Sequence, residues 1–145
     1  MRGSCLCGAV TFQITAPFRR ANYCHCSRCK KHSGSSALAQ GRVPREGFRM
    51  LSGEQQLEVY RPPGAMTKAF CRVCGSSLFG GTWPVGEEVS IRLGSLDDDP
   101  SIAPQFRTHV ASVAPWETLP DDGLPRVARQ KPARQSRPQR RPRAG

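Results

Sequence analysis

The sequence predicts an all-β protein in which short antiparallel strands form a sandwich or a folded-over sheet. Several short segments alternate apolar and polar residues, Gly and Pro turns separate them, and no segment has the apolar period of a long helix. The chain has 145 residues, which suits one domain with a modest core. A metal cross-link would help to stabilise a core of that size.

The clearest strand is expected at residues 9–15, where Val10, Phe12 and Ile14 alternate with polar residues. This pattern is typical of a half-buried strand. Similar signals recur at residues 57–61, 67–70, 77–81 and 88–93. The turn sequences RPPG at 61–64 and WPVG at 83–86 separate them.

One short helical turn is expected after Cys26. Ser27 is a suitable N-cap for it, and Gly34 would end it early.

Seven cysteines form two groups of different size. The spacing places Cys5, Cys7, Cys71 and Cys74 in one group, and Cys24, Cys26 and Cys29 in the other. Zinc takes four ligands in structural sites, so a four-thiolate set predicts a closed structural site. A set of three leaves one coordination position for a substrate. Gly8 and Gly75 each follow a cysteine, as expected where a turn around a metal-bound sulfur needs positive φ.

Other interpretations of the cysteines are less consistent with the sequence. A disulfide framework conflicts with the odd number, with the strain of a C-x-C bridge and with the lack of a signal-like apolar start. A redox C-x-x-C at Cys71 and Cys74 lacks a surrounding βαβ pattern. His32 lies three residues after Cys29 and, as a fourth ligand, would close the smaller site into a structural one.

The net charge of +11 is concentrated at the end of the chain. Residues 126–145 contain eight basic residues, no acidic residue and no aromatic residue. We expect this segment to be a disordered basic tail, and any nucleic-acid contact to involve the tail only. No apolar run is long enough to cross a membrane, so a soluble cytoplasmic protein is expected.

Three motifs resemble one known family. Residues 3–10 (GSCLCGAV), 23–29 (YCHCSRC) and 70–76 (FCRVCGS) are similar to the glutathione-dependent formaldehyde-activating enzyme family, which also includes centromere protein V. GSLD at 94–97 and APW at 114–116 look like C-terminal elements of that family. The resemblance covers residues 1–125, which we take as one zinc-binding domain, and excludes the tail.

The resemblance implies a β-tent fold, akin to methionine sulfoxide reductase B, and two zinc ions. By that likeness Cys5, Cys7, Cys71 and Cys74 hold a structural zinc, and Cys24, Cys26 and Cys29 hold a catalytic one. It also implies the addition of glutathione to formaldehyde, classed as carbon–sulfur lyase chemistry for the reverse reaction. Many relatives have a His shortly before the APW element, where this chain has Arg107 and then His109. If both lay on one strand they would share a face, and His109 could partly substitute.

The open site is expected to bind a soft fourth ligand such as the thiol of a glutathione-like substrate, which then reacts with an aldehyde. His25 lies between two ligands and is a candidate proton shuttle. Arg28, Lys30 and Lys31 are the nearest cations in sequence and could attract a carboxylate. The leading hypothesis is a zinc-dependent carbon–sulfur lyase-type enzyme similar to S-(hydroxymethyl)glutathione synthase.

Two other functions remain open at this point. The chain could be a non-catalytic zinc module whose basic tail binds nucleic acid or an acidic partner. Thiol-disulfide or sulfoxide reductase chemistry is a third hypothesis, based on fold analogy alone.

Overall fold

The computed structural model describes residues 1–129 of the chain. Within that part, the strands and the α-helix are β1 (Arg2–Ser4), β2 (Thr11–Ile14), β3 (Arg20–Cys24), α1 (Ser27–Ser33), β4 (Leu38–Pro44), β5 (Phe48–Ser52), β6 (Leu57–Tyr60), β7 (Thr67–Cys71), β8 (Ser77–Gly81), β9 (Glu88–Arg92), β10 (Arg107–Thr108) and β11 (Arg126–Val127).

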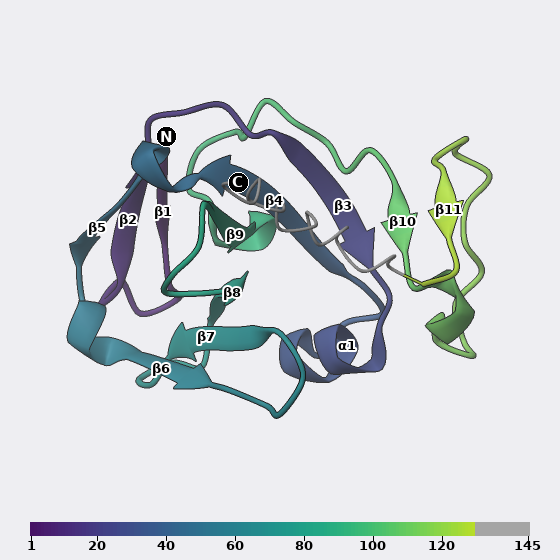
Figure 1. Cartoon of the computed structure of the whole chain (residues 1–145), viewed down its shortest axis with the longest axis horizontal. Helices are drawn as coiled ribbons and strands as arrows, with labels where there is room; N and C mark the ends of the chain where they lie inside the picture. Colours follow the sequence, from purple (N-terminus) through teal and green to yellow (C-terminus); the bar gives the residue numbers. More distant parts are fainter. Residues whose placement is uncertain (130–145) are drawn as a thin grey trace, which may run out of the picture.

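The strands form two sheets. The small sheet has the order β1-β2-β5, and the large sheet has the order β11-β10-β3-β4-β9-β8-β7-β6. Neighbouring strands are antiparallel except that β10 runs parallel to both β3 and β11. In Figure 1 the large sheet curves from β11 and β3 round to β7 and β6, and the small sheet lies on the side opposite α1 and β10. The predicted all-β, antiparallel fold class is confirmed.

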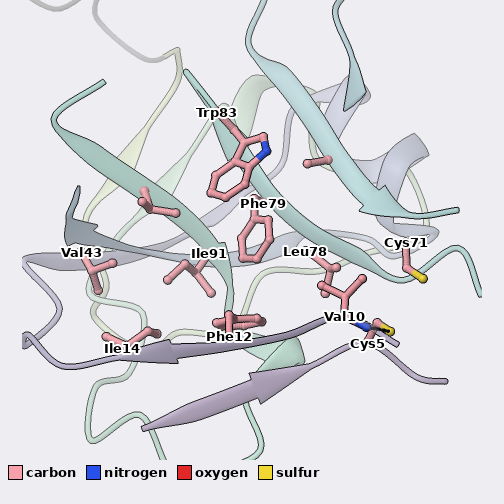
Figure 2. Close-up of a cluster of buried hydrophobic side chains, with 12 residues drawn as sticks. Cys5, Val10, Phe12, Ile14, Val43, Cys71, Leu78, Phe79, Trp83 and Ile91 are labelled. Atoms are coloured by element: carbon pink, nitrogen blue, oxygen red, sulfur yellow. Dashed lines mark hydrogen bonds between the residues drawn. The ribbon is translucent and has the colours of Figure 1, made fainter. Parts of the chain in front are cut away.

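The apolar core lies between the two sheets. Val10, Phe12 and Ile14 are at most 2% exposed, as their alternation predicted. The ring of Phe12 meets the ring of Phe79 edge-on, with centroids 5.0 Å apart, and Phe79 stacks on Trp83 at 4.4 Å. Figure 2 shows these rings at the centre of the core, with Cys5 and Cys71 at one end of it. Aromatic pairs in these geometries add stability beyond their buried area.

The strands predicted from alternation are confirmed as β2, β6, β7, β8 and β9. The sequence did not predict β3 and β4, which lie next to each other in the large sheet. Both have buried residues on both faces, so their sequences lack a simple alternation of apolar and polar residues. The small-sheet strands β1 and β5, and the two-residue strands β10 and β11, were also not predicted.

The predicted helical turn is confirmed as α1, but its N-cap is Cys26 and not Ser27. Cys26 has extended backbone angles, and its Sγ accepts a hydrogen bond from the backbone N–H of Cys29 at 3.3 Å. The thiol therefore takes the place that a hydroxyl oxygen has in a common N-cap. The helix ends at Gly34, whose φ of 67° is left-handed, as expected.

Strand structure continues past residue 125. Arg126 and Val127, which the sequence assigned to the tail, form β11 beside β10. The backbone N–H of Arg107 donates to the carbonyl of Pro125, and its guanidinium binds Asp122 at 2.6 Å. Composition could not reveal these contacts because they join distant segments. Residues 130–145, the rest of the predicted tail, lie outside the described residues.

No helix within residues 1–129 has the length and apolar character needed to cross a membrane.

We expect Gly3→Ala to destabilise the protein. Gly3 pairs with Phe12 between β1 and β2, and a Cβ at Gly3 would lie 2.2 Å from a ring carbon of Phe12. Displacing that buried ring should lower the free energy of unfolding by about 1–3 kcal/mol, as measured by urea denaturation. Gly94→Ala is the matched control, because no atom lies within 4 Å of its Cβ position. Equal stability of the two variants would contradict this packing.

Candidate metal centre

Four cysteines meet where the two sheets come together. Their sulfur atoms all lie within 4.8 Å of one another, and the residues are Cys5, Cys7, Cys71 and Cys74. The sulfurs of Cys5 and Cys7 are 3.5 Å apart, and those of Cys7 and Cys71 are 3.9 Å apart. A tetrahedral zinc with bonds of about 2.3 Å needs sulfurs about 3.8 Å apart. The cluster therefore has the dimensions of a four-thiolate zinc site, and all seven cysteines of the chain are free.

Two similar turns build this cluster. Gly8 and Gly75 have φ values of 77° and 76°, as the sequence predicted for turns around a metal-bound sulfur. The N–H of Gly8 donates to the carbonyl of Cys5, and the N–H of Gly75 donates to that of Cys71. The N–H of Val10 also points at the sulfur of Cys5, at 3.3 Å. The cluster thus connects the β1–β2 turn of the small sheet to the end of β7 in the large sheet.

The other three cysteines lie at the junction of β3 and α1. Cys24 is the last residue of β3, Cys26 caps α1, and Cys29 lies in the first turn of the helix. Their sulfur atoms also lie within 4.8 Å of one another. Within residues 1–129, no His, Asp or Glu joins this group. The protein therefore offers three sulfur ligands here and four at the first cluster.

An open pocket of about 810 Å³ lies against the three-cysteine cluster. All three cysteines line it, together with cationic side chains from the large sheet and from α1. The cations are Arg28, Arg42, Lys68 and Arg92. No Asp or Glu is among the described residues that line it. The pocket is therefore strongly cationic beside the sulfur ligands.

Lys68 and Arg92 are the most buried of these cations, at 7% and 3% exposure. The Nζ of Lys68 donates to the sulfur of Cys29 at 3.3 Å. Burial lowers the pKa of Arg92 to about 10, so this guanidinium stays charged at neutral pH. Neither residue could be assigned to the pocket from sequence, since both lie on strands far from the three cysteines in the chain.

The cations expected from sequence have different positions. Arg28 lines the pocket. The Nζ of Lys30 instead donates to the backbone carbonyl of Ser112, which ties α1 to the segment after β10. Lys31 is exposed and does not line the pocket.

Hydrogen bonds within the cluster shift the pKa values of Cys26 and Cys29 in opposite directions. Bonds with Cys24 and Cys29 lower the pKa of Cys26, whereas bonds with Cys24 and Cys26 raise the pKa of Cys29. Neighbouring thiols compete in this way because thiolates at such short separations repel each other.

The structure does not bring His25 or His32 to the sulfurs. His25 is completely buried, its Nδ1 lies 3.7 Å from a carboxylate oxygen of Glu117, and it does not line the pocket. Burial lowers its pKa. The Nδ1 of His32 lies 2.7 Å from the hydroxyl of Ser77, and His32 does not join the three sulfurs as a fourth grouped ligand. Direct proton transfer by His25 therefore has no support in the geometry.

His109 is the imidazole that reaches the pocket. Its Nδ1 lies 3.5 Å from the sulfur of Cys24, and it lines the pocket. The expectation that it shares a strand face with Arg107 was wrong, because β10 ends at Thr108 and His109 has a φ of 57°. A left-handed backbone is uncommon outside Gly and redirects the side chain. His109 does not lie close to all three sulfurs, so the group of possible metal ligands still consists of the three cysteines.

Comparison with known proteins identifies similar sequences. The family model described as glutathione-dependent formaldehyde-activating enzyme matches residues 1–112. A Halomonas elongata protein provisionally named as such an enzyme is 30% identical over 120 residues, covering 76% of this chain and 73% of that protein. A relative from Aspergillus flavus with the same provisional name is 32% identical over 78 residues. That match covers 52% of this chain but only 41% of the relative, so the chain spans less than half of the Aspergillus protein.

Comparison with solved structures also finds a similar fold. The crystal structure of a Rhodobacter sphaeroides protein superposes with a TM-score of 0.57 and 24% sequence identity. The match covers 68% of this chain and 90% of that chain. This likeness concerns the fold alone.

The two clusters should differ in their effect on stability. If the four-cysteine cluster holds zinc, Cys71→Ser should release that ion and destabilise the fold by several kcal/mol, because structural zinc binding is worth roughly 10–16 kcal/mol and is coupled to folding. We expect Cys26→Ser to weaken metal binding at the other cluster and to change the free energy of unfolding by less than about 1 kcal/mol, because a serine hydroxyl can still cap α1. Zinc content and denaturant unfolding of both variants measure this. Equal destabilisation would contradict the division into a structural and an open site.

Proposed function

Because the chain belongs to the glutathione-dependent formaldehyde-activating enzyme family, we propose that it joins a glutathione-like thiol to an aldehyde and cleaves the same adduct in reverse. In classification terms it is a zinc-dependent carbon–sulfur lyase-type enzyme similar to S-(hydroxymethyl)glutathione synthase. The single observation that best supports this proposal is the group of three sulfurs beside an open pocket, within 4.8 Å of one another.

The two sets of sulfur donors fit two zinc ions with different roles. In the proposal, Cys5, Cys7, Cys71 and Cys74 hold a structural ion, and Cys24, Cys26 and Cys29 hold a catalytic one. When bound at the three-cysteine site, zinc supplies a Lewis acid that keeps a substrate thiol deprotonated at neutral pH and stabilises sulfur as the leaving group in reverse. A site of three soft thiolates also favours a soft sulfur as its fourth ligand.

The protein's own side chains have three tasks in the reaction. Lys68 binds the sulfur of Cys29 and offsets negative charge on the cysteines. The pocket walls hold the thiol and the aldehyde close together, which reduces the entropic cost of their encounter. His109 lines the same pocket and is the candidate group for moving a proton, in place of the buried His25.

The reaction is balanced without a redox partner. The substrate sulfur attacks the carbonyl carbon of formaldehyde, and a C–S bond forms as the C=O π bond breaks. The carbonyl oxygen becomes a hydroxyl by taking a proton, so the proton lost by the thiol ends on the product oxygen. In the reverse direction the hydroxyl loses that proton, the C=O bond forms again and the sulfur leaves.

The hypothesis of a nucleic-acid-binding tail depends mainly on residues 130–145, which lie outside the described part of the chain. No observation in residues 1–129 favours it over the enzyme.

Zinc-loaded protein should accelerate the condensation of glutathione with formaldehyde, measured by NMR as formation of the S-hydroxymethyl adduct above the spontaneous rate. Cys26→Ser should lower this rate by at least about 100-fold while circular dichroism stays unchanged, because a ligand of the open site is lost. A folded, zinc-replete wild-type protein that accelerates no thiol and aldehyde pair in a broad panel would exclude the proposed activity.

His109→Ala should lower kcat by about 100- to 10,000-fold, the usual contribution of a general acid or base. Zinc content should remain at the wild-type value, because His109 is not one of the grouped ligands. His25→Phe is the comparison variant, and once it is shown to be folded its kcat should stay within about threefold of wild type. If the His25 variant loses turnover and the His109 variant does not, the assignment of the proton-transfer group is wrong.

A further inference from the structure

We propose that Arg42 and Arg92 form a carboxylate-binding subsite beside the three-cysteine cluster, so that the thiols used by this chain have an anionic group. The inference rests on the proposed thiol chemistry and assigns the residues that would bind the carboxylate of a glutathione-like thiol. Four observations support it: the sheet register, a pair of glycines, unused hydrogen-bond donors and the charge of the pocket.

The register of the large sheet places both arginines on one face. Arg92 on β9 pairs with Gln40 on β4, and Arg42 on β4 pairs with Ser90 on β9. Arg92 and Ser90 are two residues apart, as are Arg42 and Gln40, so all four side chains point to the same side. Both arginines line the pocket that contains the three sulfurs. They therefore face the space in which a bound thiol would lie.

Two consecutive glycines on β8 make room for the guanidinium groups. A Cβ at Gly80 would lie 2.3 Å from Nη2 of Arg92, and a Cβ at Gly81 would lie 2.6 Å from Nη1 of Arg42. Any larger residue at either position would push a guanidinium out of place. Gly80 and Gly81 thus leave free the space that the guanidinium groups of Arg92 and Arg42 occupy.

The two arginines have unused hydrogen-bond donors. Nη1 of Arg92 donates to Gln40 at 3.0 Å and to Ser90 at 3.3 Å, which fixes the orientation of the guanidinium. Its Nη2 is buried and has no partner among the described residues. The side chain of Arg42 makes no hydrogen bond within residues 1–129. Because a buried donor without a partner is costly, an anion that accepts from it would be stabilised.

The charge of the pocket also favours an anion. Three thiolates around a divalent zinc leave one net negative charge, which Lys68 offsets through its contact with Cys29. The charges of Arg28, Arg42 and Arg92 then remain, and no acidic side chain among residues 1–129 lines the pocket. Glu88, whose charge acts on Arg42, is already bound by Arg20 at 2.8 Å. A carboxylate suits the site because its two oxygens match the planar fork of a guanidinium.

The test compares one thiol with and without its charge. Isothermal titration calorimetry of the zinc-loaded full chain would measure the affinity for 3-mercaptopropionate and for its methyl ester. We expect the acid to bind roughly 10- to 100-fold more tightly than the ester, the range expected for a hydrogen bond to a charged group. Equal affinity of acid and ester for the wild-type protein would overturn the subsite.

Variants of Arg42 test whether the preference for the acid depends on this arginine. Arg42→Gln should reduce the preference for the acid to less than about threefold and leave the affinity for the ester unchanged, and Arg42→Lys should retain part of the preference. Arg49→Gln is the matched control, because Arg49 is exposed on β5, outside the pocket, and its loss changes the net charge equally. If Arg42→Gln weakens acid and ester by the same factor, or if Arg49→Gln abolishes the preference, the assignment is wrong.

A parallel assay separates this inference from the proposed activity. Condensation of both thiols with formaldehyde would be followed by NMR. Turnover of acid and ester with equal kcat/KM would overturn the subsite while the proposed activity stands. A charge preference in binding, together with no turnover of any thiol, would overturn the activity while the subsite stands.

Discussion

The structure depends on sulfur atoms held so close together that they cannot all be ionised without a counter-cation. Seven sulfurs lie in two groups, and within each group every pair is within 4.8 Å. Negative charges at that distance repel. Hydrogen bonds with Cys24 and Cys26, together with burial, raise the pKa of Cys29. A divalent cation would remove the repulsion at both sites. The fold supplies the geometry for such a cation and links distant segments through it.

The difference between the two groups follows from where they lie in the fold. The four-sulfur group lies at one end of the apolar core, where Figure 2 shows two of its members, Cys5 and Cys71, and it connects the two sheets. The three-sulfur group lies where β3 gives way to α1, at the edge of an open pocket. A closed set that links core elements suits stability, whereas an open set beside a pocket suits exchange of a ligand. The buried cations Lys68 and Arg92 give that pocket its charge.

Much of this could be predicted from sequence, because cysteine spacing and strand alternation are local signals. The two groups of sulfurs, the positive φ of Gly8 and Gly75, and the strands that contain Phe12 and Phe79 all agree with the sequence. The strands β3 and β4 were missed because their burial on both faces hides the alternation. Lys68 and Arg92 could not be assigned to the site, because sheet register brings them there from distant positions. His109 was considered from sequence as a partial substitute on a strand face, but a left-handed turn brings it to the pocket. The N-cap of α1 was assigned to Ser27 because a cysteine is a rare cap.

The most direct test of the account is zinc-edge X-ray absorption of the metallated protein with and without glutathione. Two zinc ions, one with four cysteine sulfurs and one with three, give an average of about 3.5 sulfurs per zinc, and binding of a substrate sulfur should raise it to about 4. An average that does not change when glutathione is added would contradict the claim that the three-cysteine site accepts a sulfur from its substrate. The claim would also be contradicted if both zinc ions had four protein ligands before glutathione was added.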